Sequence, residues 1–357
     1  MGYSRNWNTA LLVGLLALLL TAGAASSLPQ EPKPQSEPRI TANVEVVNVD
    51  VSVTDARGRF VSGLKRGNFR ILDEGAEQRI TNFSPIEAPA TILMLVETGP
   101  AVFLIHRQHL IGAWTLLQGL AADDQVALVG YDQSPRMLVP LTADKRAVAE
   151  ALGGLSYNLG ATELRFYDAV AAALDWLAPI PGKKAIVLLS TGLDTSGGAR
   201  WGALQERLRR SDVTIFPVAL GGELRDYDAR SAPAEAEGTA GQELSFEEAN
   251  QALKTMAELT GGTAWFPRRA EEFEGIYREL ATQLRNRYSL GFEPQTRDGK
   301  FHRIFVQIVD DKGRVLGPWY EELEPQTQDH KPGKRSLSPK RVRYRLFFRR
   351  GYVAPAQ

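Results

Sequence analysis

The chain has 357 residues, no cysteine, and 42 Lys and Arg residues against 42 Asp and Glu residues, so its formal net charge is zero. The balanced charge argues against a nucleic-acid-binding protein, and the absence of cysteine excludes disulfides, thiolate nucleophiles and zinc–thiolate sites. The length suffices for one sizeable α/β core and a smaller companion, since domains usually span about 100 to 200 residues.

The N-terminus has the pattern of a secretory signal peptide over residues 1–24. An apolar run at 10–20 follows Arg5 and precedes the small residues Ala22 and Ala24. The alternative is a membrane anchor, but the run is shorter than the roughly 20 residues of a spanning helix. We therefore expect an exported chain, periplasmic or extracellular, with no transmembrane segment after cleavage. Residues 25–39, rich in Pro, Gln, Glu and Ser, are expected to form a polar tether.

Residues 40–88 are predicted to form a small β module. The segment 47–54 alternates apolar and polar residues, which is the period of a strand with one buried face. Two further strand-like segments, 69–72 and 78–83, flank a turn at 73–75. This pattern is that of strands and turns, with no helical period.

Residues 89–287 alternate apolar strands with helix-length segments. Strands are expected at 91–96, 125–131, 136–141, 184–190, 213–220 and 263–266, and helices at 102–120, 145–155, 164–177, 201–210, 246–259 and 271–287. Such alternation predicts the α/β fold class, with a doubly wound, mostly parallel, Rossmann-like sheet covered by helices on both faces. The loop at 221–241 has no apolar period and is long for a compact domain, so it is either a mobile flap or a ligand-facing insertion.

Residues 288–357 return to a strand pattern. Strands are expected at 288–292, 303–309 and 343–348, with a polar, basic loop at 326–341. Because each terminal β segment is small, the two are expected to pair with each other across the α/β region.

The most informative segment is 93–101, an apolar strand that ends in Glu97 and runs into a turn and a helix. In α/β proteins the carboxyl ends of the strands are where ligands bind. An acid followed at spacing two and four by hydroxyl residues would form a hard-cation site, but those positions hold Gly99 and Ala101.

Three segments together resemble a von Willebrand factor A domain, of the secreted acidobacterial type in which a β module comes first. They are residues 93–101, 160–169 and 188–195, and the ending at 349–352 resembles the tail of that family. The resemblance covers nearly the whole mature chain and depends on the order of the motifs. It implies a bacterial, non-enzymatic adhesion or interaction protein.

The resemblance also implies a metal-ion-dependent adhesion site that holds Mg²⁺ through an Asp-x-Ser-x-Ser turn, a threonine and a second aspartate. The first aspartate falls on Glu97, the serines on Gly99 and Ala101, the threonine on Thr162 and the second aspartate on Thr191. Only Thr162 matches. Since Mg²⁺ needs near-octahedral oxygen ligands and gives up its waters reluctantly, the expected site is degenerate.

Two other acids could complete a cation site in altered geometry with Glu97 and Thr162. For Asp168 the alternative is a first-turn helix acid, and for Asp194 a loop or capping residue. The metal candidates are therefore Glu97, Thr162, Asp168 and Asp194, for Mg²⁺ or Ca²⁺, and none is assigned.

The sequence thus predicts an exported protein that binds a protein partner at the carboxyl edge of the sheet, without enzymatic activity, cofactor or nucleic acid. The predicted ligand-binding edge comprises Glu97, Thr98, Gly99, Ala101, Thr162, Thr191 and Asp194. One alternative is a Mg²⁺- or Ca²⁺-dependent adhesion domain with altered ligands. A second is a hydrolase that uses acids around the 221–241 loop.

Overall fold

In the computed structural model, the described residues are 46–55, 57, 59–86, 89–103, 106–161, 163–196, 199–220, 222, 246–317 and 344–356. The predicted signal peptide, tether and basic loop, and all of the 221–241 loop except residue 222, lie outside this part of the chain. Among the helices of the described residues, none is both long and apolar enough to cross a membrane.

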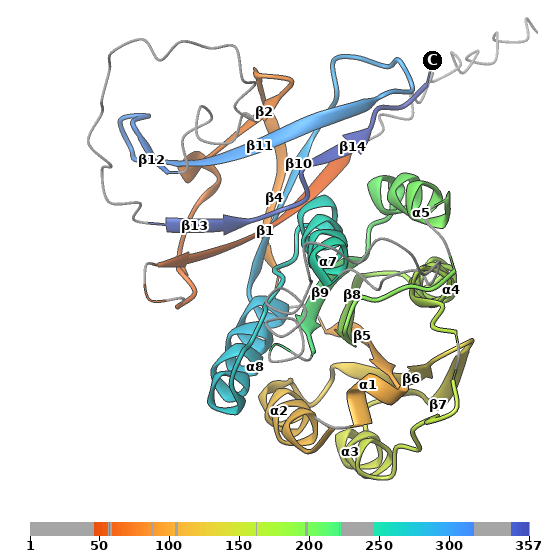
Figure 1. The fold of residues 1–357 in the computed structure, drawn as a ribbon. Helices are drawn as coiled ribbons and strands as arrows, with labels where there is room; N and C mark the ends of the chain where they lie inside the picture. Colours follow the sequence, from red (N-terminus) through yellow and green to blue (C-terminus); the bar gives the residue numbers. More distant parts are fainter. Residues whose placement is uncertain are drawn as a thin grey trace, which may run out of the picture. The chain divides into compact units, whose positions relative to one another are not determined.

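Strands from the two ends of the chain form two sheets. The first has the order β13 (Tyr344–Phe347), β1 (Val47–Asp55), β10 (Arg287–Phe292) and β4 (Ile80–Ile86). The second has the order β12 (Val315–Gly317), β11 (Phe301–Val309), β2 (Phe69–Asp73) and β3 (Ala76–Gln78), and β14 (Gly351–Val353) also pairs with β11. The predicted pairing of N- and C-terminal segments is confirmed (Figure 1).

The two sheets share one apolar core. Its members include Val49, Val51 and Val53 from β1 and Ile71 from β2. The sequence predicts that the polar residues of β1 lie on an exposed face. Two of them, Ser52 and Thr54, are buried instead. Residues 51–54 of β1 are therefore covered on both faces, which alternation alone does not reveal.

The central sheet has five strands in the order β7 (Pro135–Thr142), β6 (Gln125–Tyr131), β5 (Ala90–Glu97), β8 (Lys183–Ser190) and β9 (Thr214–Ala219). Strands β6, β5, β8 and β9 run parallel, whereas β7 is antiparallel, so the sheet is mixed. The predicted strand at 263–266 is reduced to a single parallel bridge between Trp265 and Val218.

Helices cover both faces of this sheet (Figure 1). One core cluster brings β-strand residues against α2 (His106–Gly119), α3 (Lys145–Gly153) and α8 (Ala270–Arg285). The other cluster joins the opposite face to α4 (Phe166–Leu177), α5 (Ala199–Arg210) and α7 (Phe246–Thr260). Side chains therefore alternate between two helical layers along each central strand.

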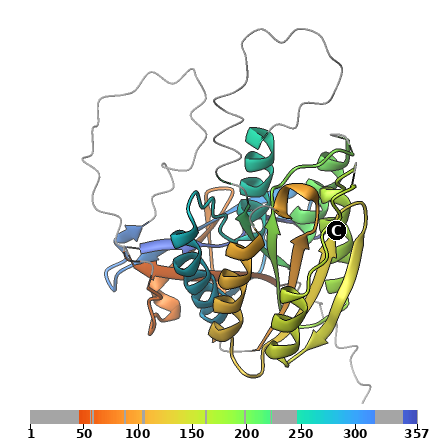
Figure 2. The same cartoon turned by 60° about the horizontal axis from the view of Figure 1, so that its bottom comes forward.

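The predicted helix at 102–120 is described as two helices, a short α1 (Pro100–Phe103) and α2, with residues 104–105 outside the description. Helix α2 lies directly against α8 (Figure 2). A side chain at Gly112 would overlap the ring of Tyr277, so glycine permits this close approach. The short helix α1 begins immediately after the turn that follows Glu97, and this connection positions the candidate site.

Candidate functional site

The carboxyl ends of the parallel strands meet at one edge of the central sheet, and Glu97 is the last residue of β5 at that edge. Strand β5 pairs with β6, the next strand in the chain, on one side. On its other side it pairs with β8, so the strand order reverses at β5. This reversal of strand order is the position where open α/β sheets bind ligands. The prediction that Glu97 ends a buried strand at the edge is confirmed.

The carboxylate of Glu97 is fully buried and hydrogen-bonded through one oxygen. Its Oε2 accepts from the Thr191 N–H at 2.7 Å, the Thr191 hydroxyl at 2.8 Å, the Ser190 hydroxyl at 3.1 Å and the Tyr131 hydroxyl at 3.3 Å. Its Oε1 has no hydrogen-bond partner among the described residues. The acid is thus held tightly at one oxygen only.

Strand register explains why these donors converge. Glu97 lies opposite Tyr131 in the β5–β6 pair, and Val96 lies opposite Leu189, one residue before Ser190, in the β5–β8 pair. The Tyr131 and Ser190 hydroxyl oxygens lie 2.6 Å apart, and the Gly192 N–H donates to the Ser190 hydroxyl at 2.8 Å. The ends of three adjacent strands are therefore joined through one carboxylate.

Burial controls the proton affinity of this cluster. It raises the pKa of Glu97 above its ordinary value, although hydrogen bonds from Thr191, Ser190 and Tyr131 act in the opposite direction. Burial and the neighbouring Glu97 carboxylate also raise the pKa of Tyr131 well above its ordinary value. Tyr131 therefore stays protonated and remains a hydrogen-bond donor.

A second polar cluster lies beside the first and was not anticipated from the sequence. Asp132, 2% exposed, follows β6 and accepts from both the Gln133 N–H and the Arg136 guanidinium, the latter at 3.0 Å. Arg136 also donates to the Thr98 hydroxyl at 3.3 Å, and that hydroxyl donates to the Tyr131 carbonyl at 3.0 Å. Asp132 directly follows a buried strand, so the rule that singled out Glu97 would also have found it.

The remaining predicted acids have other hydrogen-bond and ion-pair partners. Asp194 accepts the Tyr167 N–H in the first turn of α4 at 2.9 Å and also bonds Ser196, which is the loop or capping role expected as its alternative. Asp168 lies in the first turn of α4 and pairs with Arg200. Neither acid hydrogen-bonds to the Glu97 cluster.

Among the predicted edge residues, the side chains of Glu97, Thr98 and Thr191 are buried, as is Gly99. Thr162 lies outside the described residues, and Ala101 belongs to α1, where its side chain is not described. Glu97, Thr98, Gly99 and Thr191 therefore form a buried layer at the carboxyl edge of the sheet, which is called the floor of the edge below.

The position of Gly99, in the turn after Glu97, lies beside the unpaired oxygen of Glu97. A Cβ added to Gly99 would lie 3.7 Å from Glu97 Oε1 and 3.3 Å from Leu164 Cδ1. In the described part of the chain, no group of three or more His, Cys, Asp or Glu side chains gathers where it could hold a metal ion. Glu97 and the position of Gly99 are thus adjacent, as the resemblance implies.

Two exposed apolar side chains lie on segments that adjoin the turn after Glu97. Phe103 in α1 is 41% exposed, and Leu159, in the loop after α3, is 59% exposed. The Phe103 ring lies 5.8 Å from that of Tyr157, edge to face. The Asn158 N–H donates to the Thr98 carbonyl at 2.9 Å, so this loop is joined directly to the turn after Glu97.

A cavity of about 290 Å³ opens beside the Arg136 cluster. It is lined by Thr98, Arg136, Leu138, Ala151, Gly154, Leu155 and Ser156. The described edge therefore combines exposed apolar groups, one half-exposed arginine and a small hollow.

No family model matches the sequence, and no curated protein matches it. Among solved structures, the chain is similar to an aerotolerance-related membrane protein from Bacteroides fragilis, at 17% identity and a TM-score of 0.39, covering 54% of this chain and 98% of that chain. It is also similar to a von Willebrand factor type A protein from Catenulispora acidiphila, at 13% identity and a TM-score of 0.43, covering 77% and 73% of the two chains. At identities and TM-scores this low, the function proposed below rests on the geometry of the chain itself.

Proposed function

We propose that this chain is an exported, non-enzymatic interaction protein of the von Willebrand factor A type, which binds a protein partner at the carboxyl edge of its central sheet without a metal ion. The order of the central strands supports the doubly wound fold of this type. Numbered from β5 along the chain, it reads 3-2-1-4-5, with Trp265 adding a bridge beyond the fifth strand. The apolar run and small residues of the N-terminus support export.

The observation that carries the metal-independent mechanism is the closed set of donors around Glu97 Oε2. Thr191 donates two hydrogen bonds to this oxygen, and the Ser190 and Tyr131 hydroxyls, which are hydrogen-bonded to each other, also lie within hydrogen-bond distance of it. A divalent cation at the same oxygen would compete with them. Gly99 supplies no side-chain oxygen, and Mg²⁺ requires near-octahedral oxygen coordination.

The partner would contact the exposed groups on the segments that adjoin the turn after Glu97. Phe103 and Leu159 supply apolar area, and Arg136 supplies a half-exposed guanidinium bonded to Thr98. Interfaces between proteins are enriched in aromatic residues and arginine at their centres, with a polar rim. The hydrogen bonds between Glu97 and Thr191 then hold the ends of β5 and β8, and with them the turn that leads to Phe103.

A second candidate, a Mg²⁺- or Ca²⁺-dependent adhesion domain, is favoured by one observation. Glu97 Oε1 is buried, has no hydrogen-bond partner among the described residues and lies beside the position of Gly99. A cation at that oxygen would use Glu97 together with Thr162.

Calorimetric titration with Mg²⁺ and with Ca²⁺ separates the two candidates. We expect no saturable heat from the purified mature protein. Saturable binding that the nearly isosteric Glu97→Gln variant abolishes would establish the second candidate and overturn the metal-independent mechanism.

Affinity capture from envelope extract, with and without chelator, tests the interaction itself. We expect the same partner in both arms, and we expect Phe103→Ser and Leu159→Ser to reduce its recovery. Ile111→Ser is the matched control, since Ile111 is an exposed apolar residue of α2 and not one of the predicted edge residues. Equal loss with all three variants, or loss only with chelator, would contradict the proposed mode of binding.

A further inference from the structure

Residues 350–356 pair with the beginning of β11 and with the turn at 297–300 that precedes it. Strand β14 forms the ladder with β11, and beyond it the Ala354 N–H donates to the Lys300 carbonyl at 2.8 Å. Tyr352 and Ala354 belong to the apolar core that the two β sheets share. This segment and the turn therefore close one end of that core together.

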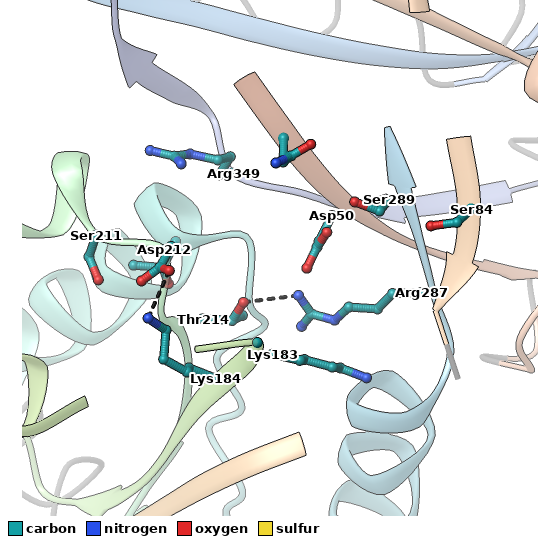
Figure 3. A pocket seen from close by; sticks show the side chains of 13 residues that line it. Asp50, Ser84, Lys183, Lys184, Ser211, Asp212, Thr214, Arg287, Ser289 and Arg349 are labelled. Carbon is teal, nitrogen blue, oxygen red and sulfur yellow. Dashed lines mark hydrogen bonds and ion pairs between the residues drawn. The ribbon is translucent and has the colours of Figure 1, made fainter. Parts of the chain in front are cut away.

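Arg349 holds the beginning of this segment. Its Nε donates to the Gly351 carbonyl at 2.7 Å, and its Nη2 donates to the carbonyl of Arg209, near the end of α5, at 2.9 Å. The same residue lines a cavity of about 440 Å³ that opens where β8 and β9 begin (Figure 3). A guanidinium keeps its charge in proteins, so this contact does not respond to pH.

The rest of the segment adjoins a histidine that has a carboxylate at each ring nitrogen. His302 Nδ1 lies 3.0 Å from Asp73 Oδ1 at the end of β2, and Nε2 lies 3.2 Å from Asp298 Oδ1 in the turn. The Tyr352 hydroxyl donates to the second oxygen of Asp73 at 2.9 Å. Side chains from β2, β11, β14 and the turn thus meet at one ring.

This arrangement requires two protons on the ring. An ionised carboxylate accepts hydrogen bonds and donates none, so His302 bonds both acids only as an imidazolium. A neutral ring has a single N–H and leaves one of the two carboxylates without its donor. Asp73, 5% exposed, pairs with no other cation among the described residues. Loss of the proton would therefore leave a buried anion unpaired, with the Asp298 carboxylate also facing the ring.

The neighbouring charged groups supply no replacement for the imidazolium. Arg303, next in β11, pairs with Glu74 at 3.3 Å, and its backbone N–H donates to Glu74 as well. Lys300 approaches Asp298 through its backbone N–H, at 2.9 Å. Burial would lower the pKa of His302, but hydrogen bonds and charges from the two acids outweigh burial and raise it.

We propose that protonation of His302 is a latch that holds residues 352–356 and the turn at 297–300 against β2, and that this end of the core opens locally when the proton is lost. The closed state favours the protonated ring, so the latch is fully closed below pH 6.5 and opens as pH rises through the folded-state pKa. The Arg349 contact persists, because it does not titrate. Local opening of this kind does not require the rest of the fold to unfold.

Hydrogen exchange of single amides in the purified mature chain, followed by NMR from about pH 5.5 to about pH 8.5, tests the latch. The reporter is the Ala354 N–H, which is bonded to the Lys300 carbonyl. After correction for the intrinsic effect of pH on exchange, its protection factor should fall by about tenfold, as expected when a charge-assisted hydrogen bond is lost. A protection factor that stayed constant or rose with pH would overturn the proposal.

The turn at 310–314 is a control within the same molecule. Asp310 accepts the backbone N–H groups of Lys312 and Arg314, at 3.0 and 2.8 Å, much as Asp298 accepts that of Lys300, but no histidine of the described residues bonds to it. The Gly313 N–H, which donates to the Asp310 carbonyl, should keep a constant protection factor. A fall of equal size at Gly313 would show a general loosening of the sheets and contradict the latch.

Two variants assign the effect to His302. His302→Gln can retain a hydrogen bond but cannot titrate, so the pH-dependent fall at Ala354 should disappear. Asp298→Asn alters only an exposed turn and keeps an acceptor for the Lys300 N–H. It should move the fall to lower pH, because one of the two acids that favour the protonated ring is removed. Asp310→Asn is its matched control and should leave the fall unchanged. An unaltered fall in either His302→Gln or Asp298→Asn would contradict the assignment.

Discussion

Thr191 donates two hydrogen bonds to a single oxygen of Glu97, through its backbone N–H at 2.7 Å and its hydroxyl at 2.8 Å. Both residues depart from the pattern implied by the resemblance, in which aspartates stand at the two positions. The departures are complementary, because the longer glutamate reaches across to the strand end where a threonine replaces an acid. Two buried carboxylates at these positions would repel each other unless a cation lay between them.

Glu97 should therefore stabilise the fold chiefly as a hydrogen-bond acceptor. We expect Glu97→Ala to lower the free energy of unfolding by about 2–4 kcal/mol, since it leaves buried donors unpaired and creates a cavity. Glu97→Gln retains an acceptor and similar volume, so its cost should be about 1 kcal/mol or less. Urea denaturation monitored by tryptophan fluorescence measures both. Equal losses for the two variants would show that the charge, rather than the acceptor, is what the cluster requires.

The raised pKa of Glu97 predicts a particular pH dependence. A carboxyl group whose folded-state pKa lies above its ordinary value of 4.5 contributes stability that is fully present below that value. This contribution is lost as pH rises through the folded-state pKa. The difference in unfolding free energy between the parent chain and Glu97→Gln should therefore decrease with rising pH above about 4.5. A difference that grows with pH would mean that the carboxylate is stabilised in its charged form.

The order of strands and helices could be predicted from the sequence because each central strand is a continuous apolar run. The segment 125–131 matches β6 residue for residue, and the antiparallel edge strand β7 was expected near its position. Residues 263–266 fail as a strand, since only Trp265 pairs with β9. Short segments of this kind depend on tertiary contacts that local pattern does not encode.

The candidate site was predictable in part. A strand that ends in an acid pointed to Glu97, but its donors come from Tyr131 and Ser190, whose convergence depends on the register of three strands. The cavity that opens where β8 and β9 begin was not predictable, because the residues that line it, such as Asp50, Lys184 and Arg349, are far apart in the chain and meet only in the folded protein. Neither feature produces a local sequence signal.

Arg136 should stabilise the edge through Asp132. Burial would raise the pKa of Asp132, yet hydrogen bonds from Arg136 and from the Gln133 N–H outweigh burial and lower it. We expect Arg136→Ala to cost about 1–3 kcal/mol, because a buried carboxylate loses a charged donor. Arg165→Ala is a suitable control, since Arg165 pairs with the exposed Glu163. Thermal unfolding compares the two, and equal effects would contradict the assigned role of Asp132.

Restoring the ligands that the resemblance implies should create a Mg²⁺ site. The variant combines Glu97→Asp, Gly99→Ser, Ala101→Ser and Thr191→Asp. Without metal it should be less stable than the parent chain, because two carboxylates face each other. With Mg²⁺ in hundredfold excess over its dissociation constant, binding should return about 2.7 kcal/mol of stability. Thr191→Asp alone is the control and should not respond to Mg²⁺. If Mg²⁺ did not stabilise the fourfold variant, the resemblance to a von Willebrand factor A domain at this edge would be contradicted.

The β sheets contain a second pH-sensitive group, His302. Burial would lower its pKa, but hydrogen bonds and charges from Asp73 and Asp298 outweigh burial and raise it above the ordinary value of 6.5. Its Nδ1 lies 3.0 Å from Asp73 Oδ1, and the Tyr352 hydroxyl donates to Asp73 Oδ2 at 2.9 Å. His302 is 8% exposed, so its contact with Asp73 is buried between β11 and β2.

A histidine with a raised folded-state pKa contributes stability that is fully present below pH 6.5 and is lost as pH rises through the folded-state value. The unfolding free energy of the parent chain should therefore fall across this interval. In His302→Gln the hydrogen bonds can persist while the titration cannot, so that variant should lack this part of the pH dependence. Urea denaturation at a series of pH values measures it. If His302→Gln retained the full slope, the dependence would have to arise from another group.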